Sequence, residues 1–261
     1  VSTVREAGKI PADAFLQELQ RVDLGDSVVR ATNRLLRIWG VREMQSGEWQ
    51  KGALDFGAVA QARRLEYYPF RGSFAQLALL DLPAVIELNV PSRRERRFLV
   101  LLKVSGDRCR VLLDREYDVP LRVLNAYWFG TSHLFWKDFD SLGHRLSVGS
   151  VGENVRRLHA LLFSVQALDS AELPLAGQET IFNRRTEKAV TRFQQAKQLN
   201  PDGVVGPLTT ILLYKSFPAA YAYPSLNTVA GAATPGEGSA RREEMRGDPV
   251  GMRATAGKEG T

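Results

Sequence analysis

The sequence predicts an α+β domain, followed by a small all-α bundle of three helices and a disordered tail. Strand-like runs with short connections fill much of the first half, helical periods broken by turn residues begin near residue 150, and large apolar residues almost vanish after Val229. Short connections favour antiparallel strands, and amphipathic helices of this length pack around a shared core. The expected boundaries are 1–11 for an N-terminal segment, 12–142 for the α+β domain, 143–150 for a linker, 151–218 for the bundle and 219–261 for a C-terminal extension, disordered from about residue 229.

The α+β domain is expected to begin with helices and to end with strands. Asp26 is the predicted N-cap of a helix whose apolar stripe runs from Val28 to Ile38 and which ends near Gly40. The short turn at 105–107 joins two apolar runs and predicts an antiparallel pair. We expect further helices at 56–62 and 73–80, and strands at 84–90, 97–104, 108–113 and 133–136.

Three helices are predicted between residues 151 and 216. The first carries apolar residues at helical spacing from Val155 to Val165, and the second carries them from Ala189 to Ala196. Asp202-Gly203 then supplies a turn, because glycine takes positive φ without strain. Pro207 suits the first position of a third helix. Short helices that each show one apolar face indicate a compact bundle.

The charge balance fits an anionic partner but does not choose one. The chain has 261 residues, with 35 Lys and Arg against 29 Asp and Glu, which gives a net charge of +6. Nucleic acid, lipid head groups and the cell wall all carry negative charge. The basic residues at 92–97 accompany no zinc-finger spacing, RNP aromatic pattern or basic zipper. We therefore interpret this segment as a solvated loop and expect no nucleic-acid partner.

Cofactors and metal ions are not expected. The one cysteine, Cys109, lies in an apolar stretch, where a buried structural thiol is usual. His133, His144 and His159 are scattered along the chain and have no cysteine partner, which argues against a metal site. The apolar runs are too short to cross a bilayer, so membrane contact is expected only through a segment absent from this chain.

The second half of the bundle resembles the peptidoglycan-binding type 1 domains. Their pattern T-x2-AV-x2-FQ...DG-x2-GP-x-T is present from Thr186 through Gln194 and Gly203 to Thr209. The resemblance implies peptidoglycan as a partner. In the bundle, Phe193 and Val205 are expected as packing supports, and Gly203 as a turn residue. The residues expected nearer the ligand are Arg192, Gln194, Asp202 and Thr209.

His159 has two possible roles in this bundle. It lies on the first predicted helix, where the family often has Gln, and it could touch a wall peptide. A surface histidine on a helix without a binding role is the commoner case, because site residues are rare. We therefore expect His159 on the surface.

The order of motifs in the first domain resembles the papain-like cysteine peptidases that process bacteriocin leader peptides. These enzymes have Asp-Cys at the start of a helix, Leu-Pro before the sheet, His-Phe at the next strand and Asp-Pro after another. The matching places here are Asp26-Ser27, Leu82-Pro83, Arg97-Phe98 and Asp114-Arg115. The resemblance implies a papain-like peptidase-type fold in the α+β domain.

The catalytic side chains of that family are replaced in this sequence. Ser27 offers a hydroxyl where the family has a thiolate, and it needs a base to take its proton. Arg97 cannot be that base, because a guanidinium stays protonated in proteins. We therefore expect no catalytic residue, treat Ser27, Arg97 and Asp114 as vestigial positions, and expect an ion pair between Arg97 and Asp114 that joins two strands.

Together the two domains resemble the periplasmic part of general secretion pathway protein A, the ExeA-like family of type II secretion. The resemblance implies a periplasmic location as part of an inner-membrane protein. It also implies a B component and secretin pathway proteins as partners, and a function in placing the outer-membrane secretin through the cell wall. On this interpretation the chain is a non-enzymatic pseudo-peptidase that binds peptidoglycan.

Two alternatives stay open at this point. The chain could be an active peptidase or cell-wall amidase that uses Ser27 with a displaced base such as His133. It could also be a protein-binding scaffold without wall affinity, with the basic loop from Arg93 to Arg97 as a contact. Turnover that vanishes in Ser27→Ala would distinguish the first, and partner capture without wall binding the second.

Overall fold

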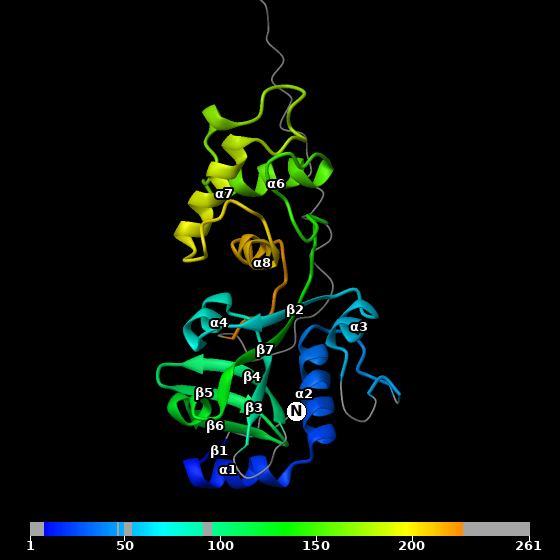
Figure 1. Ribbon diagram of the computed structural model, residues 1–261, viewed down its shortest axis with the longest axis vertical. Coiled ribbons are helices and arrows are strands. Elements are labelled where there is room, and N and C mark those ends of the chain that lie inside the picture. Colours follow the sequence, from blue (N-terminus) through cyan, green and yellow to red (C-terminus); the bar gives the residue numbers. More distant parts are fainter. Residues whose placement is uncertain (1–7, 46, 50–53, 91–95, 227–261) are drawn as a thin grey trace, which may run out of the picture.

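The computed structural model describes residues 8–45, 47–49, 54–90 and 96–226, and it has two parts (Figure 1). A β-sheet with flanking helices forms the lower part in this view, and a group of helices forms the upper part. The predicted α+β class and the three-helix bundle are confirmed. The expected disordered tail and the basic residues Arg93 and Arg94 lie outside the described residues.

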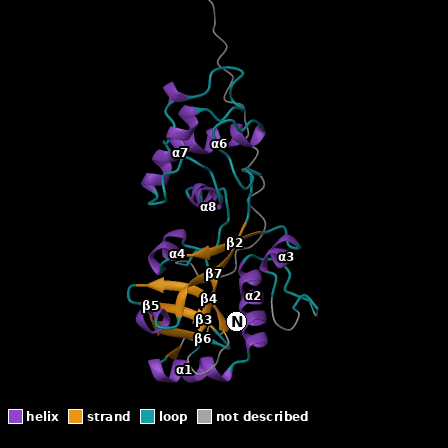
Figure 2. Cartoon of the chain, viewed as in Figure 1, coloured by secondary structure: helices purple, strands orange, loops and turns teal. Residues whose placement is uncertain are grey.

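The lower part is built on one seven-stranded sheet with the order β1-β6-β5-β4-β3-β7-β2 (Figure 2). Neighbouring strands are antiparallel, except that β1 runs parallel to β6. The predicted hairpin at 105–107 is confirmed as the β4–β5 connection. The strands are β1 (Gly8–Lys9), β2 (Glu66–Arg71), β3 (Ala84–Asn89), β4 (Arg96–Ser105), β5 (Arg108–Leu112), β6 (Glu116–Pro120) and β7 (Trp128–Trp136).

Both faces of this sheet are covered by other elements, which explains the unbroken apolar run in the sequence of β4. Side chains alternate between the two faces of a strand. Phe98, Val100 and Leu102 join the apolar cluster under α2, whereas Leu99 and Leu101 join the cluster on the other face. A strand buried on both faces reads as a continuous apolar run. The sheet is therefore a middle layer between helices.

Four helices from the first part of the chain, and a fifth short one, pack around the sheet (Figure 1). Helix α2 covers one face, with Ala31, Leu35 and Leu36 buried against it. On the other face α1 and α4 contribute Phe15 and Leu77. The helices are α1 (Ala12–Arg21), α2 (Leu24–Ile38), α3 (Phe56–Gln61), α4 (Phe74–Leu80) and α5 (Leu121–Asn125).

The N-cap of α2 is Asp23, and the prediction of Asp26 was wrong. The Asp23 carboxylate accepts a hydrogen bond from the Gly25 amide at 2.8 Å. That bond chiefly lowers the pKa of Asp23. Asp26 instead lies in the first turn and forms an ion pair with Arg30 one turn further on. Two aspartates three residues apart both suit a helix start, and side-chain geometry decides between them.

The upper part consists of α6 (Glu153–Ser164), a short 3₁₀ turn η1 (Ser170–Glu172), α7 (Arg184–Ala196) and α8 (Pro207–Lys215). Helix α8 lies between the other two helices and the sheet (Figure 1). Its residues from Thr209 to Tyr214 are all buried. A helix that is buried on every side must have neighbours all round. The buried residues of α8 belong to the same apolar cluster as those of α1 and α4.

Polar contacts join the two parts at α8 and at the segment that follows it. The Lys215 ammonium lies 2.9 Å from the Asp81 carboxylate, and the hydroxyl of Tyr214 donates to Asp138 at 2.6 Å. The ring of Tyr223 packs edge-on against Trp39 of the α2 C-cap. The chain thus returns from the helices to the sheet, and the two parts share one interface.

Candidate functional site

Helix α7 and the loop after it form a surface site. The Asn183 side chain accepts from the amides of Arg185 and Thr186, which fixes the start of the helix. Ala189, Val190 and Phe193 are buried against the rest of the bundle. The opposite face of α7 therefore faces solvent, and the loop at 200–206 returns along its C-terminal half.

Gln194 holds this loop against the helix from inside. The residue is 2% exposed, and its amide oxygen accepts from the Gly203 amide at 2.9 Å. Its amide nitrogen lies 2.9 Å from both Asp202 Oδ1 and the Val204 carbonyl oxygen. A buried amide with its donors and acceptor all engaged gives a specific and rigid arrangement. Gln194 was predicted to lie near the ligand; its buried side chain supports the loop from behind and bonds to Asp202, which lines the cavity described below.

Gly203 allows the loop to approach α7 closely. Its φ is 71°, in the left-handed region where a side chain is strained. A Cβ at this position would lie 2.7 Å from Glu187 Cγ and 3.1 Å from Thr191 Oγ1. Only glycine satisfies both the backbone conformation and the packing without a shift of the loop.

A cavity of about 480 Å³ lies between this loop and the exposed face of α7. Six residues line it, and four of them carry charged side chains. Lys188 and Asp202 are exposed to solvent, whereas Glu187 and Thr191 are half-buried. The lining residues are Glu187, Lys188, Thr191, Arg192, Pro201 and Asp202.

Arg192 lines the cavity but is held by other groups of the protein. Its guanidinium donates to the Ala167 carbonyl at 2.7 Å and to the Glu172 carboxylate at 2.5 Å. The Asp169 amide and Arg192 together lower the pKa of Glu172. Arg192 therefore fastens the segment around η1 to α7 and has a fixed orientation at the cavity.

The other predicted binding residues divide into two groups. Arg192 and Asp202 line the cavity, and Gly203 lies directly behind it. Phe193 and Val205 are buried in the core. Thr209 was expected nearer the ligand, but it is 4% exposed and its hydroxyl lies 3.2 Å from Gln194 Nε2. Thr209 is thus enclosed at the start of α8 and does not line the cavity.

The sequence prediction missed three lining residues on α7: Glu187, Lys188 and Thr191. They lie five, four and one positions before the predicted Arg192, and they line the same cavity. Residues at i, i+4 and i+5 line one side of a helix. These residues could have been predicted as those on the exposed face of the helix that the Asp202-Gly203 turn packs against.

His159 is buried rather than on the surface, as a correction to the prediction. It is 4% exposed, and its Nδ1 lies 2.9 Å from the Glu179 carbonyl oxygen. That carbonyl can only accept, so Nδ1 carries the proton and Nε2 accepts from the Thr186 hydroxyl at 2.8 Å. Burial lowers the pKa of His159. The ring therefore links α6 to α7 and to the loop at Glu179.

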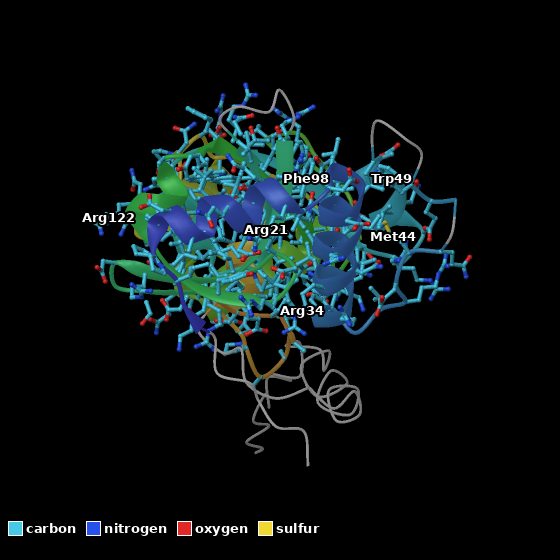
Figure 3. All side chains as sticks on the ribbon, turned by 90° about the horizontal axis from the view of Figure 1, so that it is seen from below. Arg21, Arg34, Met44, Trp49, Phe98 and Arg122 are labelled. Carbon is cyan, nitrogen blue, oxygen red and sulfur yellow. The ribbon has the colours of Figure 1, made fainter. Side chains whose placement is uncertain are left out.

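Ser27 lies at the buried contact between α2 and β4. Its hydroxyl donates to the Leu24 carbonyl at 2.8 Å and accepts from the Phe98 amide at 3.2 Å. The residue has an exposure of 0%. Figure 3 shows Phe98 beside α2, with Trp49 and Met44 on the segment that follows this helix. Trp49 packs against Gly25, so the start of α2 is covered.

Arg97 is at the start of β4, next to the strand residue that bonds to Ser27. It is also fully buried, and its Nη1 donates to the Arg96 carbonyl at 2.8 Å. The expected ion pair with Asp114 does not form. Asp114 is exposed and accepts from the Tyr117 hydroxyl at 2.8 Å. In the sheet, Arg97 is in register with Leu88 of β3.

His133 lies within the sheet and not at its rim. Its Nδ1 bonds to the Tyr67 hydroxyl at 2.9 Å, and its Nε2 lies 3.6 Å from the Glu87 carboxylate. The ring stacks on Phe56 with 3.8 Å between centroids. Burial acts to raise the pKa of Glu87, but hydrogen bonds from His133 and Arg96 outweigh it and lower the pKa. Both ring nitrogens of His133 thus face groups other than Ser27.

The described residues hold neither a metal-binding cluster of side chains nor a helix that could span a membrane. No group of three or more His, Cys, Asp or Glu side chains within the ranges 8–45, 47–49, 54–90 and 96–226 could hold a metal ion. Over the same part of the chain, every helix is too short or too polar to cross a bilayer. Cys109 is buried, and burial raises the pKa of its thiol to about 12.

Comparison with known sequence families identifies the helical part. Residues 151–213 match the family described as "Putative peptidoglycan binding domain". The predicted peptidoglycan-binding domain is thereby confirmed, and the matched range contains all six residues that line the cavity. We call residues 151–213 the peptidoglycan-binding domain. A comparison of the whole chain with curated proteins found no match.

Solved structures similar to this chain include two from Vibrio species. One is a periplasmic domain of the EpsAB fusion protein of the Vibrio vulnificus type II secretion system, with 22% identity, a TM-score of 0.42, and coverage of 71% of this chain and 79% of that chain. The other is the N-terminal peptidase C39 like domain of the toxin secretion ATP-binding protein from Vibrio parahaemolyticus, with 19% identity, a TM-score of 0.36, and coverage of 44% of this chain and 100% of that chain.

Proposed function

We propose that this chain is the non-enzymatic, wall-binding part of a periplasmic assembly factor of type II secretion. The observation that carries the proposal is the peptidoglycan-binding domain at 151–213, with an open, charged cavity on its α7 face. The domain would grip the wall through short-range hydrogen bonds and ion pairs. The chain would thereby hold an inner-membrane protein at the layer through which a secretin must pass.

The surroundings of Ser27 support a role without catalysis. A serine nucleophile needs an exposed hydroxyl with a base in contact. The Ser27 hydroxyl is 0% exposed, and its donor and acceptor functions are both satisfied by backbone groups. Arg97 keeps its proton at any physiological pH and cannot replace an imidazole. The α+β domain would then be a scaffold that positions the wall-binding surface.

The interface around α8 supports joint action of the two parts. Tyr214 and Lys215, the last two residues of α8, bond to Asp138 and Asp81, and the segment after α8 packs back on Trp39. A load on the wall-bound domain would be passed directly to the α+β domain. We propose that the α+β domain contacts a protein partner, for which the B component and the secretin pathway proteins are candidates.

Sedimentation with isolated sacculi tests the proposal. The purified chain is incubated with sacculi at moderate salt, pelleted, and quantified in both fractions, while the supernatant is analysed for released wall fragments. We expect the chain in the pellet and no released fragments. A chain that stays entirely in the supernatant contradicts wall binding, and fragments whose release is lost in Ser27→Ala contradict the non-enzymatic role.

A matched variant separates wall binding from general charge attraction. The chain carries a net charge of +6, and any cationic protein adheres to an anionic wall to some degree. Gln194→Ala disturbs the loop behind the cavity without a change in charge, and Gln195→Ala alters an exposed neighbour on the same helix. We expect Gln194→Ala to weaken pelleting and Gln195→Ala to leave it unchanged. Equal pelleting of the two would indicate charge attraction alone.

A further inference from the structure

The charged groups of the α7 cavity differ in whether the protein already engages them. Arg192 bonds to Ala167 and Glu172, as described above. Glu187 accepts from Arg184 at 2.8 Å, so its carboxylate is shared with a neighbour on the helix. Lys188 forms no hydrogen bond or ion pair with the residues that the structure describes. It therefore presents a cation that is available to a ligand.

Asp202 contributes a carboxylate of which one oxygen is held by hydrogen bonds within the protein. Its Oδ1 accepts from Gln194 Nε2 and from the Val204 amide, both at 2.9 Å. Within the described ranges Oδ2 accepts no hydrogen bond. A side chain anchored through one oxygen loses little conformational entropy when the other oxygen binds a ligand. Asp202 is thus prepared to accept from a donor in the cavity.

One available ammonium group and one available carboxylate oxygen therefore line the same cavity, Lys188 and Asp202. A ligand that pairs with both must itself carry a carboxylate and an ammonium. A volume of about 480 Å³ is within the range of small-molecule sites and can hold one or two amino-acid residues. The neutral sugars of a glycan strand would use neither charge.

We propose that this cavity binds the zwitterionic end of a peptidoglycan stem peptide, a residue with a free amine and a free carboxylate on its side chain. The ligand carboxylate would pair with Lys188, and the ligand amine would pair with Asp202 Oδ2. This inference rests on the proposed wall-binding function and names the part of the wall that is recognised. Because uncrosslinked peptides keep that amine free, the site would prefer them to crosslinked ones.

Soluble muropeptides provide the first test. The probes are a disaccharide tetrapeptide with an unmodified diaminopimelate residue, the same compound with the side-chain amine acetylated, and the same compound with the side-chain carboxylate amidated. Binding to the full chain is measured by isothermal titration calorimetry at low salt, where exposed ion pairs are screened least. We expect the unmodified compound to bind more tightly than either modified compound, by up to about fivefold, the upper range for one exposed ion pair.

Two substitutions assign the charges to their partners. Asp202→Asn keeps Oδ1 and its two hydrogen bonds, so the loop stays in place while the free oxygen is lost. Lys188→Gln removes an ammonium group that forms no hydrogen bond or ion pair with a described residue. We expect Asp202→Asn to abolish the preference for the free amine, and Lys188→Gln to abolish the preference for the free carboxylate. The controls Asp13→Asn and Arg185→Gln make equal charge changes at exposed positions outside the cavity.

The outcomes separate this inference from the proposed function. If the wild-type chain pellets with sacculi but binds all three muropeptides equally, wall binding stands and the zwitterion site is wrong. The same holds if peptide-free glycan strands compete as well as intact muropeptide. If the wild-type chain neither pellets nor binds any muropeptide, the proposed function itself fails. The inference is supported if Asp202→Asn removes the preference for the free amine and Lys188→Gln removes the preference for the free carboxylate.

Discussion

The contact between α2 and β4 and the cavity on α7 are built from similar parts, yet they differ in what they leave available. Each has a helix, a polar side chain that bonds to backbone groups, and an arginine nearby. At the α2 contact, the Ser27 hydroxyl and Arg97 are fully enclosed. At α7, Gln194 is enclosed, but it holds Asp202 at the surface. Internal hydrogen bonds close the first region and shape the second.

The two regions therefore differ in which polar groups remain available to a ligand. Ser27 now serves as a bridge between a helix end and a strand, a structural task that a buried hydroxyl performs well. The functional surface requires groups whose hydrogen-bonding capacity is not exhausted within the protein. Such groups lie beside Gln194, at Lys188 and Asp202. Burial thus distinguishes polar groups with a structural role, such as the Ser27 hydroxyl, from polar groups that a ligand can reach, such as Lys188 and Asp202.

The largest expected effect comes from Gln194→Ala, which breaks the support of the α7 cavity. The Gly203 amide would lose its acceptor, and a void would open in a packed site. A buried polar group left unsatisfied costs about 1–3 kcal/mol, so we expect a loss of about 3 kcal/mol in the free energy of unfolding with the void included. Urea unfolding measures this, with the exposed Gln195→Ala as control. A loss below that of the control would show that the loop is held in another way.

The next effect concerns the closed region and should leave wall binding intact. In Ser27→Ala the buried Phe98 amide loses its acceptor, and we expect a loss of about 2 kcal/mol in the free energy of unfolding. Pelleting with sacculi should be unchanged after correction for folded protein. Ser164→Ala, which removes an exposed hydroxyl, is the control. Loss of wall binding in a folded Ser27→Ala protein would break the separation between the two regions.

Gly203→Ala tests how closely the loop must approach α7. Both Gly203 and Gly106 have positive φ, but only at Gly203 would a Cβ meet other atoms. We expect both alanine variants to lose about 1 kcal/mol from backbone strain, and Gly203→Ala to lose more, together with weaker sacculus binding. Equal losses, measured by thermal unfolding, would mean that the loop shifts freely and that close packing at Gly203 does not shape the cavity.

The smallest expected effect is a pH dependence of stability in the peptidoglycan-binding domain. Burial lowers the pKa of His159 in the folded state below the ordinary value of 6.5. As pH falls below 6.5, the unfolded chain takes up a proton that the folded chain resists, so the free energy of unfolding decreases. Urea unfolding at pH 7.5 and 5.5 should show a larger decrease for the wild type than for His159→Gln. An equal decrease would contradict the role of His159 in this titration.

The parts of this fold that were predictable depend on contacts close in sequence. The stripe from Ala189 to Ala196, the turn at Asp202-Gly203 and the apolar run of β4 each follow from local periodicity or backbone preference. Strand β2 was missed, because Pro69 is unusual in strands and its position at the sheet edge is known only from the topology. Helix α1 lacked a side-chain cap to mark its start.

The burial of polar residues was the part that the sequence did not reveal. Gln194 and Thr209 are ordinary surface residues by type. Gln194 is enclosed by loop residues 8 and 10 positions further along, and Thr209 bonds to Gln194, 15 positions earlier. His159 is enclosed by Glu179 and Thr186, which lie 20 and 27 residues further along the chain. The ion pair of Arg97 and Asp114 depended on strand register, which a motif order does not fix. Long-range packing decides each of these cases.

Hydrogen exchange with and without soluble muropeptide tests the central claim most directly, because it locates the ligand on the chain. The account predicts slower exchange of the Gly203 and Val204 amides and of the second half of α7, with no change at Ser27 or Phe98. Slower exchange confined to the start of α2 and β4 would contradict it, since the ligand would then occupy the region that we describe as closed.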